Sequence, residues 1–110
     1  MSDNPLLDTV VEINAVSLAN VDASMEALLL VRLAALVAVD APPASYLATF
    51  RAAEDTLLEL EDARNVLITV APIVGTPKVV SAARNMAKAL GFALAIDEAL
   101  LEAELEDDEA

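Results

Sequence analysis

The 110-residue sequence contains no cysteine and no histidine. Without cysteine the chain cannot form disulfides, carry out thiolate redox chemistry or build a Cys/His zinc site. Without histidine it cannot contain a Ser-His-Asp triad or a Cys-His nucleophile pair. The acidic C-terminal residues also lack the spacing and the turn glycine of a calcium loop. We therefore predict neither a bound cofactor nor a metal site.

Basic residues are few: six Lys and Arg stand against 19 Asp and Glu, for a formal net charge of −13. Eight of the acidic residues and no basic residue lie in 97–110, so the first 96 residues hold eleven acidic and six basic side chains. Nucleic-acid binding needs a basic surface that releases counterions, and no basic stripe is present. Anionic membranes are disfavoured by the same sign of charge. We expect neither a nucleic acid nor a membrane as partner.

Long hydrophobic runs are also missing, although hydrophobic residues make up 57% of the chain. The richest stretch, 27–39 (ALLLVRLAALVAV), is 13 residues long with Arg32 near its centre. A membrane-spanning helix needs about 20 mostly apolar residues. No basic segment opens the chain, so we expect no signal peptide and a cytoplasmic location. The surplus of apolar residues is then best covered by self-association, which predicts a homo-oligomer.

Glycine occurs only twice, at Gly75 and Gly91, and Ala and Leu dominate the rest of the chain. This composition, without sustained alternation of β-branched and polar residues, predicts an all-α fold. We expect five to six helices, at about 4–18, 24–39, 44–55, 60–74 and 77–90, with a sixth stretch from 92 that is broken near 97. Residues 1–96 are predicted to form one helical domain, and 97–110 an acidic, partly disordered helix or tail.

Several helix boundaries can be assigned from capping residues. Asp22 is a candidate N-cap for the second helix, which is apolar nearly all round and is expected to be covered on most sides. The pair of prolines ends that helix, and Pro43 opens the third. Pro72 predicts a kink or an early end of the fourth helix, and Thr76 is expected to cap the fifth. The two glycines are expected to end the fourth and fifth helices.

The segments LLLVRLAALVAVDAPPASYLATFRAA and LEDARNVLITVAPIVGTPKVVSAARNMAKALG resemble the carboxymuconolactone decarboxylase-like family, whose superfamily includes alkylhydroperoxidase D-type proteins. The resemblance covers about 24–90 and is closest to small actinobacterial-type members with DAPPASYL in place of a redox motif. It rests on the long apolar helix, the following RAA helix and the APIVGTPKVVSA corner. It implies an all-α fold assembled as a trimer or hexamer.

The resemblance does not transfer the family's chemistry. Aligned on RAA, the two cysteines of the redox members fall at Pro42 and Ser45 and their histidine at Thr49. Their proton-relaying glutamate falls near Leu29, one turn from Glu26. Thiol peroxidase activity is excluded because no thiolate is available. The lactone decarboxylases proper use histidine, which this chain lacks, so the resemblance implies a fold and an assembly rather than an activity.

The break between the second and third helices, VDAPPASYLATF, is the candidate site. Three hydroxyl side chains share one helical face there because their spacings are three and four residues. They either form a small-ligand pocket with Asp40 or have purely local roles at the helix ends and in the core. Arg32 is either an anion anchor beneath that pocket or part of a structural ion pair. The predicted pocket consists of Asp40, Pro42, Ser45, Tyr46, Thr49 and Arg32.

These observations predict a non-catalytic oligomeric protein with a structural or small-ligand-binding role. The alternative is an enzyme of the decarboxylase, hydrolase or isomerase type that uses Asp40, Tyr46 and Thr49 for acid–base chemistry on a small metabolite. The expected partners are further copies of the chain and a small molecule.

Overall fold

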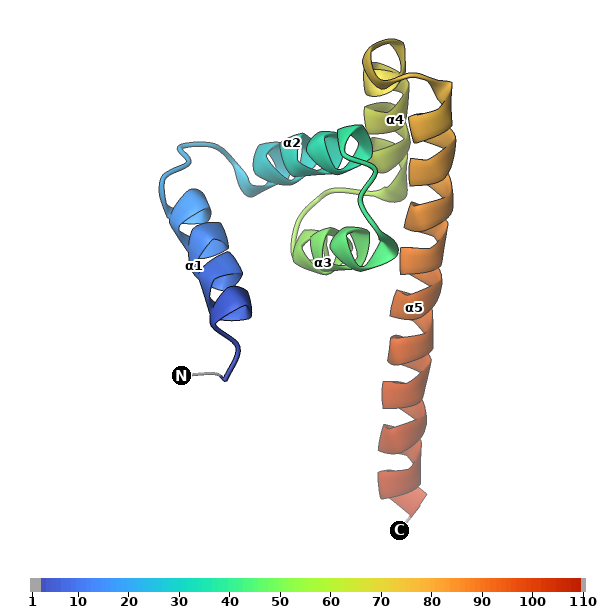
Figure 1. The fold of residues 1–110 in the computed structure, drawn as a ribbon. Helices are drawn as coiled ribbons and strands as arrows, with labels where there is room; N and C mark the ends of the chain where they lie inside the picture. The colour runs from blue at the N-terminus through green and yellow to red at the C-terminus, as the bar shows by residue number, and fades with distance from the viewer. Residues whose placement is uncertain (1–2, 110) are drawn as a thin grey trace.

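The computed structural model describes the backbone of residues 3–109 and the side chains of 3–91, 99, 102 and 103. Within that part the chain is all-helical, with five helices and no strand, which confirms the predicted fold class. Helices α2 to α5 pack together, whereas α1 stands apart from them (Figure 1). The helices are α1 (Pro5–Ala19), α2 (Met25–Ala38), α3 (Pro43–Ala53), α4 (Leu60–Val74) and α5 (Thr76–Glu109).

The first two helices begin at side-chain caps. Asn4 caps α1, where its Oδ1 accepts a hydrogen bond of 3.1 Å from the Leu7 N–H, and Pro5 follows at the first helical position. Ser24 caps α2 through a 3.1 Å bond from the Ala27 N–H to its hydroxyl. The prediction of Asp22 as this cap is therefore wrong, because the helix begins after the later hydroxyl residue.

The α2–α3 corner is a Schellman turn built around Asp40, which has a positive φ of 54°. The Ala41 N–H donates to the Leu36 carbonyl (3.0 Å) and the Asp40 N–H donates to the Val37 carbonyl (3.2 Å). This pairing satisfies carbonyl groups that the end of α2 would otherwise leave without partners. Pro43 then opens α3, as the sequence predicts.

Helix α4 begins with a capping box between Glu59 and Asp62 and continues past Pro72 to Val74. The predicted bounds are confirmed, and of the two predicted effects of Pro72 the early end is wrong. Gly75 joins α4 to α5 with φ 88° and ψ 158°. Its carbonyl accepts from the Val79 N–H at 3.3 Å. The start of α5 is therefore at Thr76, which is the first helical residue and not the cap.

A single helix, α5, takes the place of the two helices expected at 77–90 and from 92 onward. Helix α5 runs through Gly91 and past 97 to Glu109, so the predicted stop at Gly91 and break near 97 are both wrong. Glycine inside a helix costs only about 1 kcal/mol relative to alanine. Gly91 does not adopt the positive φ that would end a helix. The predicted boundary at 97 is thus not a helix boundary, and Ala110 lies outside the described residues.

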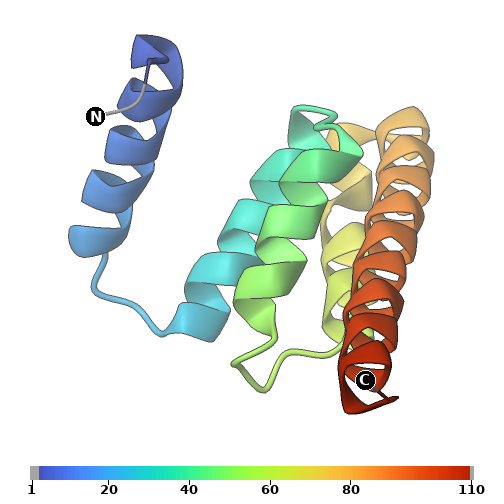
Figure 2. The same cartoon turned by 90° about the horizontal axis from the view of Figure 1, so that it is seen from below.

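The core lies where α2, α3, α4 and α5 meet, as the two views agree (Figures 1 and 2). Tyr46 and Val37 are its largest fully buried side chains. Helix α2 packs against α3, α4 and α5, and most of its positions are buried or half-buried, in line with the expectation that it is covered on most sides; Val31, on the remaining side, is 70% exposed. The core consists of Leu33, Val37, Ala41, Tyr46, Ala63, Ala82, Met86 and Ala89.

Helix α1 has no buried residue, and none of its Cα atoms lies within 8 Å of a described residue in another helix. Figure 2 shows the same separation from a second direction. No helix in the described part of the chain has both the length and the apolar composition needed to cross a bilayer.

Candidate functional site

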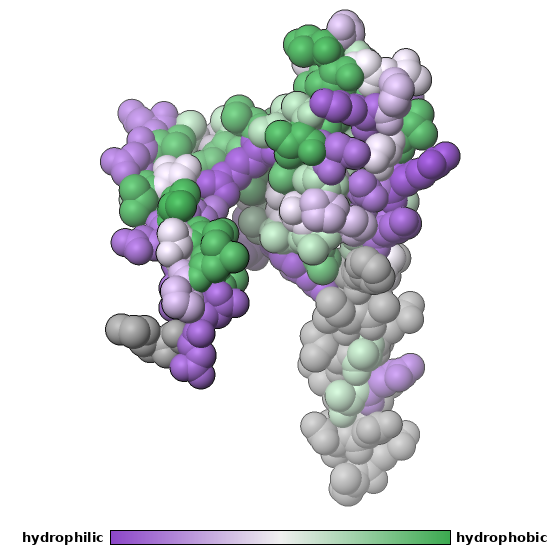
Figure 3. Space-filling view, viewed as in Figure 1, coloured by the Kyte–Doolittle hydropathy of each residue, from purple (hydrophilic) through white to green (hydrophobic). Residues whose placement is uncertain are grey.

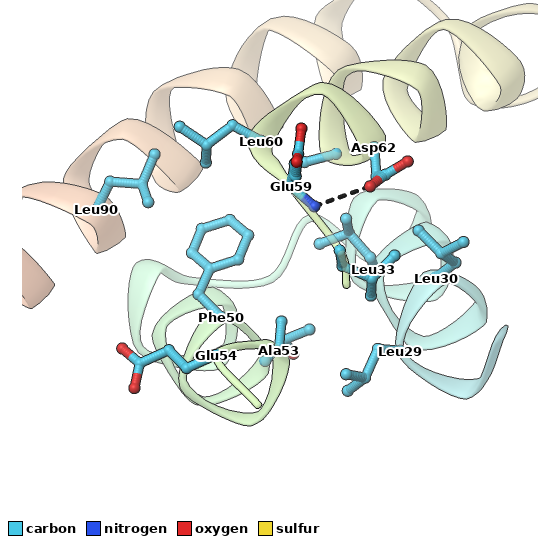
Figure 4. A pocket seen from close by; sticks show the side chains of 13 residues that line it. Leu29, Leu30, Leu33, Phe50, Ala53, Glu54, Glu59, Leu60, Asp62 and Leu90 are labelled. Atoms are coloured by element: carbon cyan, nitrogen blue, oxygen red, sulfur yellow. Dashed lines mark hydrogen bonds between the residues drawn. The ribbon is translucent and has the colours of Figure 1, made fainter. Parts of the chain in front are cut away.

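An apolar cavity of about 310 Å³ opens between the N-terminal half of α2, the C-terminal half of α3 and the start of α4. The leucines of α2 form one wall and Phe50 of α3 lies across from them (Figure 4). Leu60 and Leu90 close the side toward α5. Small side chains at Ala53 and Ala63 leave the space open, since larger residues there would fill it.

The polar groups around this cavity are mostly carboxylates, which also accept a hydrogen bond from the local backbone or form an ion pair with a neighbouring side chain. Asp62 accepts a 2.8 Å bond from the Glu59 N–H, the contact drawn in Figure 4. Glu54 pairs with Arg51 at 2.7 Å. Thr49 donates its hydroxyl hydrogen to the Ser45 carbonyl at 3.2 Å. The cavity is therefore an apolar chamber with an acidic rim.

Only Thr49 of the six predicted pocket residues lines this cavity. Arg32 points to the side of α2 that faces α1, where it donates to Asn14 (2.5 Å) and more distantly to Ser17 (3.4 Å). Pro42 is the N-cap of α3, and the Ser45 N–H donates to its carbonyl at 3.1 Å. The six predicted pocket residues thus lie on several different surfaces and do not line one common pocket.

Asp40 belongs to a polar cluster that joins the α2–α3 corner to α5. Its carboxylate accepts from the Ser81 hydroxyl at 2.5 Å. One turn earlier Lys78 donates to the Ala38 carbonyl at 2.8 Å, and one turn later Asn85 donates to the Ala41 carbonyl at 3.1 Å. A lysine at the C-terminal end of a helix also complements its dipole.

This cluster was missed by the sequence analysis, although the signal was present. Lys78, Ser81 and Asn85 are three and four residues apart and share one face of α5. Their partners lie 40 to 44 residues earlier in the chain, a pairing that spacing alone does not reveal.

Tyr46 lies in the core next to this cluster, with no exposed surface. Its hydroxyl has no hydrogen-bond partner among the described residues. Burial, and to a smaller degree the negative charge of Asp40, raise the pKa of the Tyr46 hydroxyl above its usual value of 10.0. Asp40 and Tyr46 are thus close enough to interact electrostatically, whereas Thr49 lines a different space.

The raised pKa of Tyr46 predicts that stability falls with pH in the alkaline range. The unfolded chain releases the phenolic proton near pH 10, whereas the folded chain retains it. The contribution of the protonated Tyr46 hydroxyl to the free energy of unfolding is therefore fully present below about pH 10 and is lost as the pH rises further. Because Tyr46 is the only tyrosine, tyrosinate absorbance reports its titration directly. Tyr46→Phe is expected to remove this pH dependence, and titration at the ordinary pKa would contradict the prediction.

Among the described side chains, no three acidic residues are grouped so that they could hold a metal ion. No protein-family model, curated protein or solved structure matches the chain. The family resemblance therefore stays a proposal that rests on the quoted residues alone.

Proposed function

We propose that the protein is a homo-oligomer, similar to the carboxymuconolactone decarboxylase-like family, that binds a small apolar molecule in the cytoplasm without transforming it. The supporting observation is the cavity between α2, α3 and α4, whose walls are almost entirely leucine, phenylalanine and alanine. Its volume of about 310 Å³ is in the range of small-ligand pockets.

The rim of the cavity restricts the chemistry of the ligand. Glu54, Glu59 and Asp62 line the apolar chamber, and Arg51 forms an ion pair with Glu54. A ligand with a free carboxylate would meet like charges at this rim. The arrangement favours a neutral apolar compound, or one with an amine or another hydrogen-bond donor at one end.

The enzymatic alternative is less well supported by the geometry. Acid–base chemistry needs its groups within hydrogen-bond reach of one substrate. Thr49 lines the apolar cavity, Asp40 is bonded to Ser81 at the corner, and Tyr46 is enclosed in the core. Of the three, the apolar cavity is lined by Thr49 alone, and the neighbouring groove between α2 and α4 is lined by none of them.

The ligand-binding proposal is tested by filling the cavity. Ala53→Phe places a ring in the chamber and is expected to weaken binding of the neutral dye Nile red at least about tenfold. Ala52 precedes it on α3 and is exposed, so Ala52→Phe is the matched control and should leave binding within about twofold. Fluorescence titration measures both, with circular dichroism as the folding control.

Two results would count against ligand binding. One is the absence of saturable dye binding to the wild-type protein. The other is equal weakening by Ala53→Phe and Ala52→Phe, which would place the dye outside the cavity. Native mass spectrometry of protein purified from its own host would then show directly whether a small molecule accompanies each subunit.

A further inference from the structure

The polar side chains that line the apolar cavity between α2, α3 and α4 offer a ligand hydrogen-bond acceptors only. They are Thr49, Glu54, Glu59 and Asp62. An ionised carboxylate has acceptor atoms and no donor. The Thr49 hydroxyl donates its hydrogen to the Ser45 carbonyl at 3.2 Å, which leaves the lone pairs of its oxygen for a ligand. These side chains therefore recognise hydrogen-bond donors and have nothing to donate to a carbonyl, carboxylate or phosphate group.

The charge of the lining has one sign. Glu54, Glu59 and Asp62 contribute three carboxylates, and no lysine or arginine lines the cavity. Arg51 pairs with Glu54 at 2.7 Å and offsets one of these charges. The formal net charge of −13 on the whole chain adds to the same field. The surroundings of the cavity therefore attract a cation and repel an anion.

The start of α4 is the feature of the lining that would attract an anion, because the first N–H groups of a helix carry a partial positive charge. The capping box already occupies this position. The Glu59 N–H donates to the Asp62 carboxylate at 2.8 Å, and the Glu59 side chain accepts from the Asp62 N–H. The chain's own carboxylates thus stand where an anionic head group of a ligand would bind.

The Glu54 carboxylate lies at the edge of the cavity and not within it. Its side chain is 57% exposed. Figure 4 shows Leu29, Leu33 and Phe50 around the space and Glu54 at its periphery. A cationic group beside Glu54 keeps part of its water shell and avoids most of the cost of burying a charge. A hydrocarbon group attached to it can leave water by entering the cavity.

We propose that the ligand of this cavity is a cationic amphiphile, an amine whose ammonium group lies beside Glu54 and whose apolar part fills the space between α2, α3 and α4. This inference rests on the proposed ligand-binding function, and it decides between the neutral and the amine-bearing ligands which that function leaves open. Glu54 is assigned to the head group because Glu59 and Asp62 cap α4, whereas Glu54 is held by an exposed ion pair, which is weak.

Three probes that share an octyl chain test the head group: octylamine, octanol and octanoate. Each is titrated against the wild-type protein with bound Nile red, below the concentration at which it forms micelles, and dye displacement is measured by fluorescence. We expect octylamine to bind at least about tenfold more tightly than octanoate and at least about threefold more tightly than octanol. Added salt should weaken octylamine binding and strengthen octanoate binding, because it screens both interactions with the carboxylates.

Helix α1 offers the probes a second apolar surface, which has to be separated from the cavity. Figure 3 shows apolar side chains on this helix, and Leu6, Val10 and Ile13 are more than half exposed. Ala53→Phe fills the cavity and leaves α1 unchanged. The dye displacement that the wild type shows and Ala53→Phe lacks therefore measures binding in the cavity alone.

Substitutions at the Glu54–Arg51 pair are expected to act with opposite signs. Glu54→Gln removes the carboxylate and should weaken octylamine binding at least about threefold. Arg51→Gln removes the competing cation and should strengthen it. Asp55→Asn is the matched control, because Asp55 follows Glu54, is exposed and does not line the cavity. It removes the same charge and should change octylamine binding less than about twofold. Circular dichroism confirms that each variant is folded.

The outcomes separate this inference from the proposed function. If the wild-type protein shows no saturable Nile red binding, both are wrong. If Nile red binds and octanoate or octanol displaces it as well as octylamine does, ligand binding stands and the cationic ligand class is wrong. Equal weakening by Glu54→Gln and Asp55→Asn would show that the net charge of the chain attracts the amine, and would overturn the assignment of its ammonium group to Glu54.

Discussion

Replacing Tyr46 by alanine is expected to lower the free energy of unfolding by about 3–5 kcal/mol. The side chain has no exposed surface, and its ring centroid lies 6.5 Å from that of Phe50 in a tilted arrangement. Its removal leaves a cavity among small neighbours such as Ala82 and Ala89, which cannot expand to fill it. A domain of this size is commonly only about 5–15 kcal/mol stable, so this single change removes a large fraction of the total.

The conservative substitution Tyr46→Phe is expected to keep or raise the free energy of unfolding. Tyr46→Phe keeps the packed ring and removes a buried hydroxyl that has no hydrogen-bond partner among the described residues. An unsatisfied buried polar group costs about 1–3 kcal/mol, so the phenylalanine variant should equal or exceed the wild type in stability. Denaturant titration at neutral pH measures both variants. A loss of more than about 1 kcal/mol in Tyr46→Phe would show that the hydroxyl is hydrogen-bonded in solution.

The sequence predicts most of the helices because the signals that start and end them are local. Pro5 and Pro43 each stand at the first position of a helix and act within one turn, so such starts can be read without tertiary information, whereas the predicted caps Asp22 and Thr76 are each off by one or two residues. The errors also follow from local reasoning. Gly91 was expected to end a helix, but its own conformation is helical and its cost is too small to outweigh a long run of helix-favouring neighbours.

The position of the cavity depends on packing between segments that are distant in the sequence, so it cannot be predicted from the spacing of residues. Residues of the VDAPPASYLATF segment share a helical turn, as expected, yet the fold buries Tyr46 and directs Thr49 to a separate space. The cavity exists because Ala53 and Ala63, ten residues apart on different helices, both face it. Alanine is frequent throughout this chain, so its presence at these two positions gives no signal in the sequence.

The two glycines are expected to respond to the same substitution with opposite signs. Gly75 has φ 88° and ψ 158°, a region that is essentially restricted to glycine. A Cβ atom there would meet Pro77 Cδ only at 3.9 Å, an ordinary contact, so Gly75→Ala introduces backbone strain without a clash. We expect a loss of about 1–3 kcal/mol in unfolding free energy.

Gly91 lies inside α5, and a Cβ atom built on it meets nothing within 4 Å. Gly91→Ala should therefore raise the unfolding free energy by about 0.5–1 kcal/mol, because alanine loses less conformational freedom in a helix. Denaturant unfolding of the single and double variants gives both values, and the double variant should equal the sum because the two sites are far apart along α5. A loss in Gly91→Ala would show that the helix does not continue through this position. A gain in Gly75→Ala would show that the residue joining α4 to α5 does not adopt the positive φ described here.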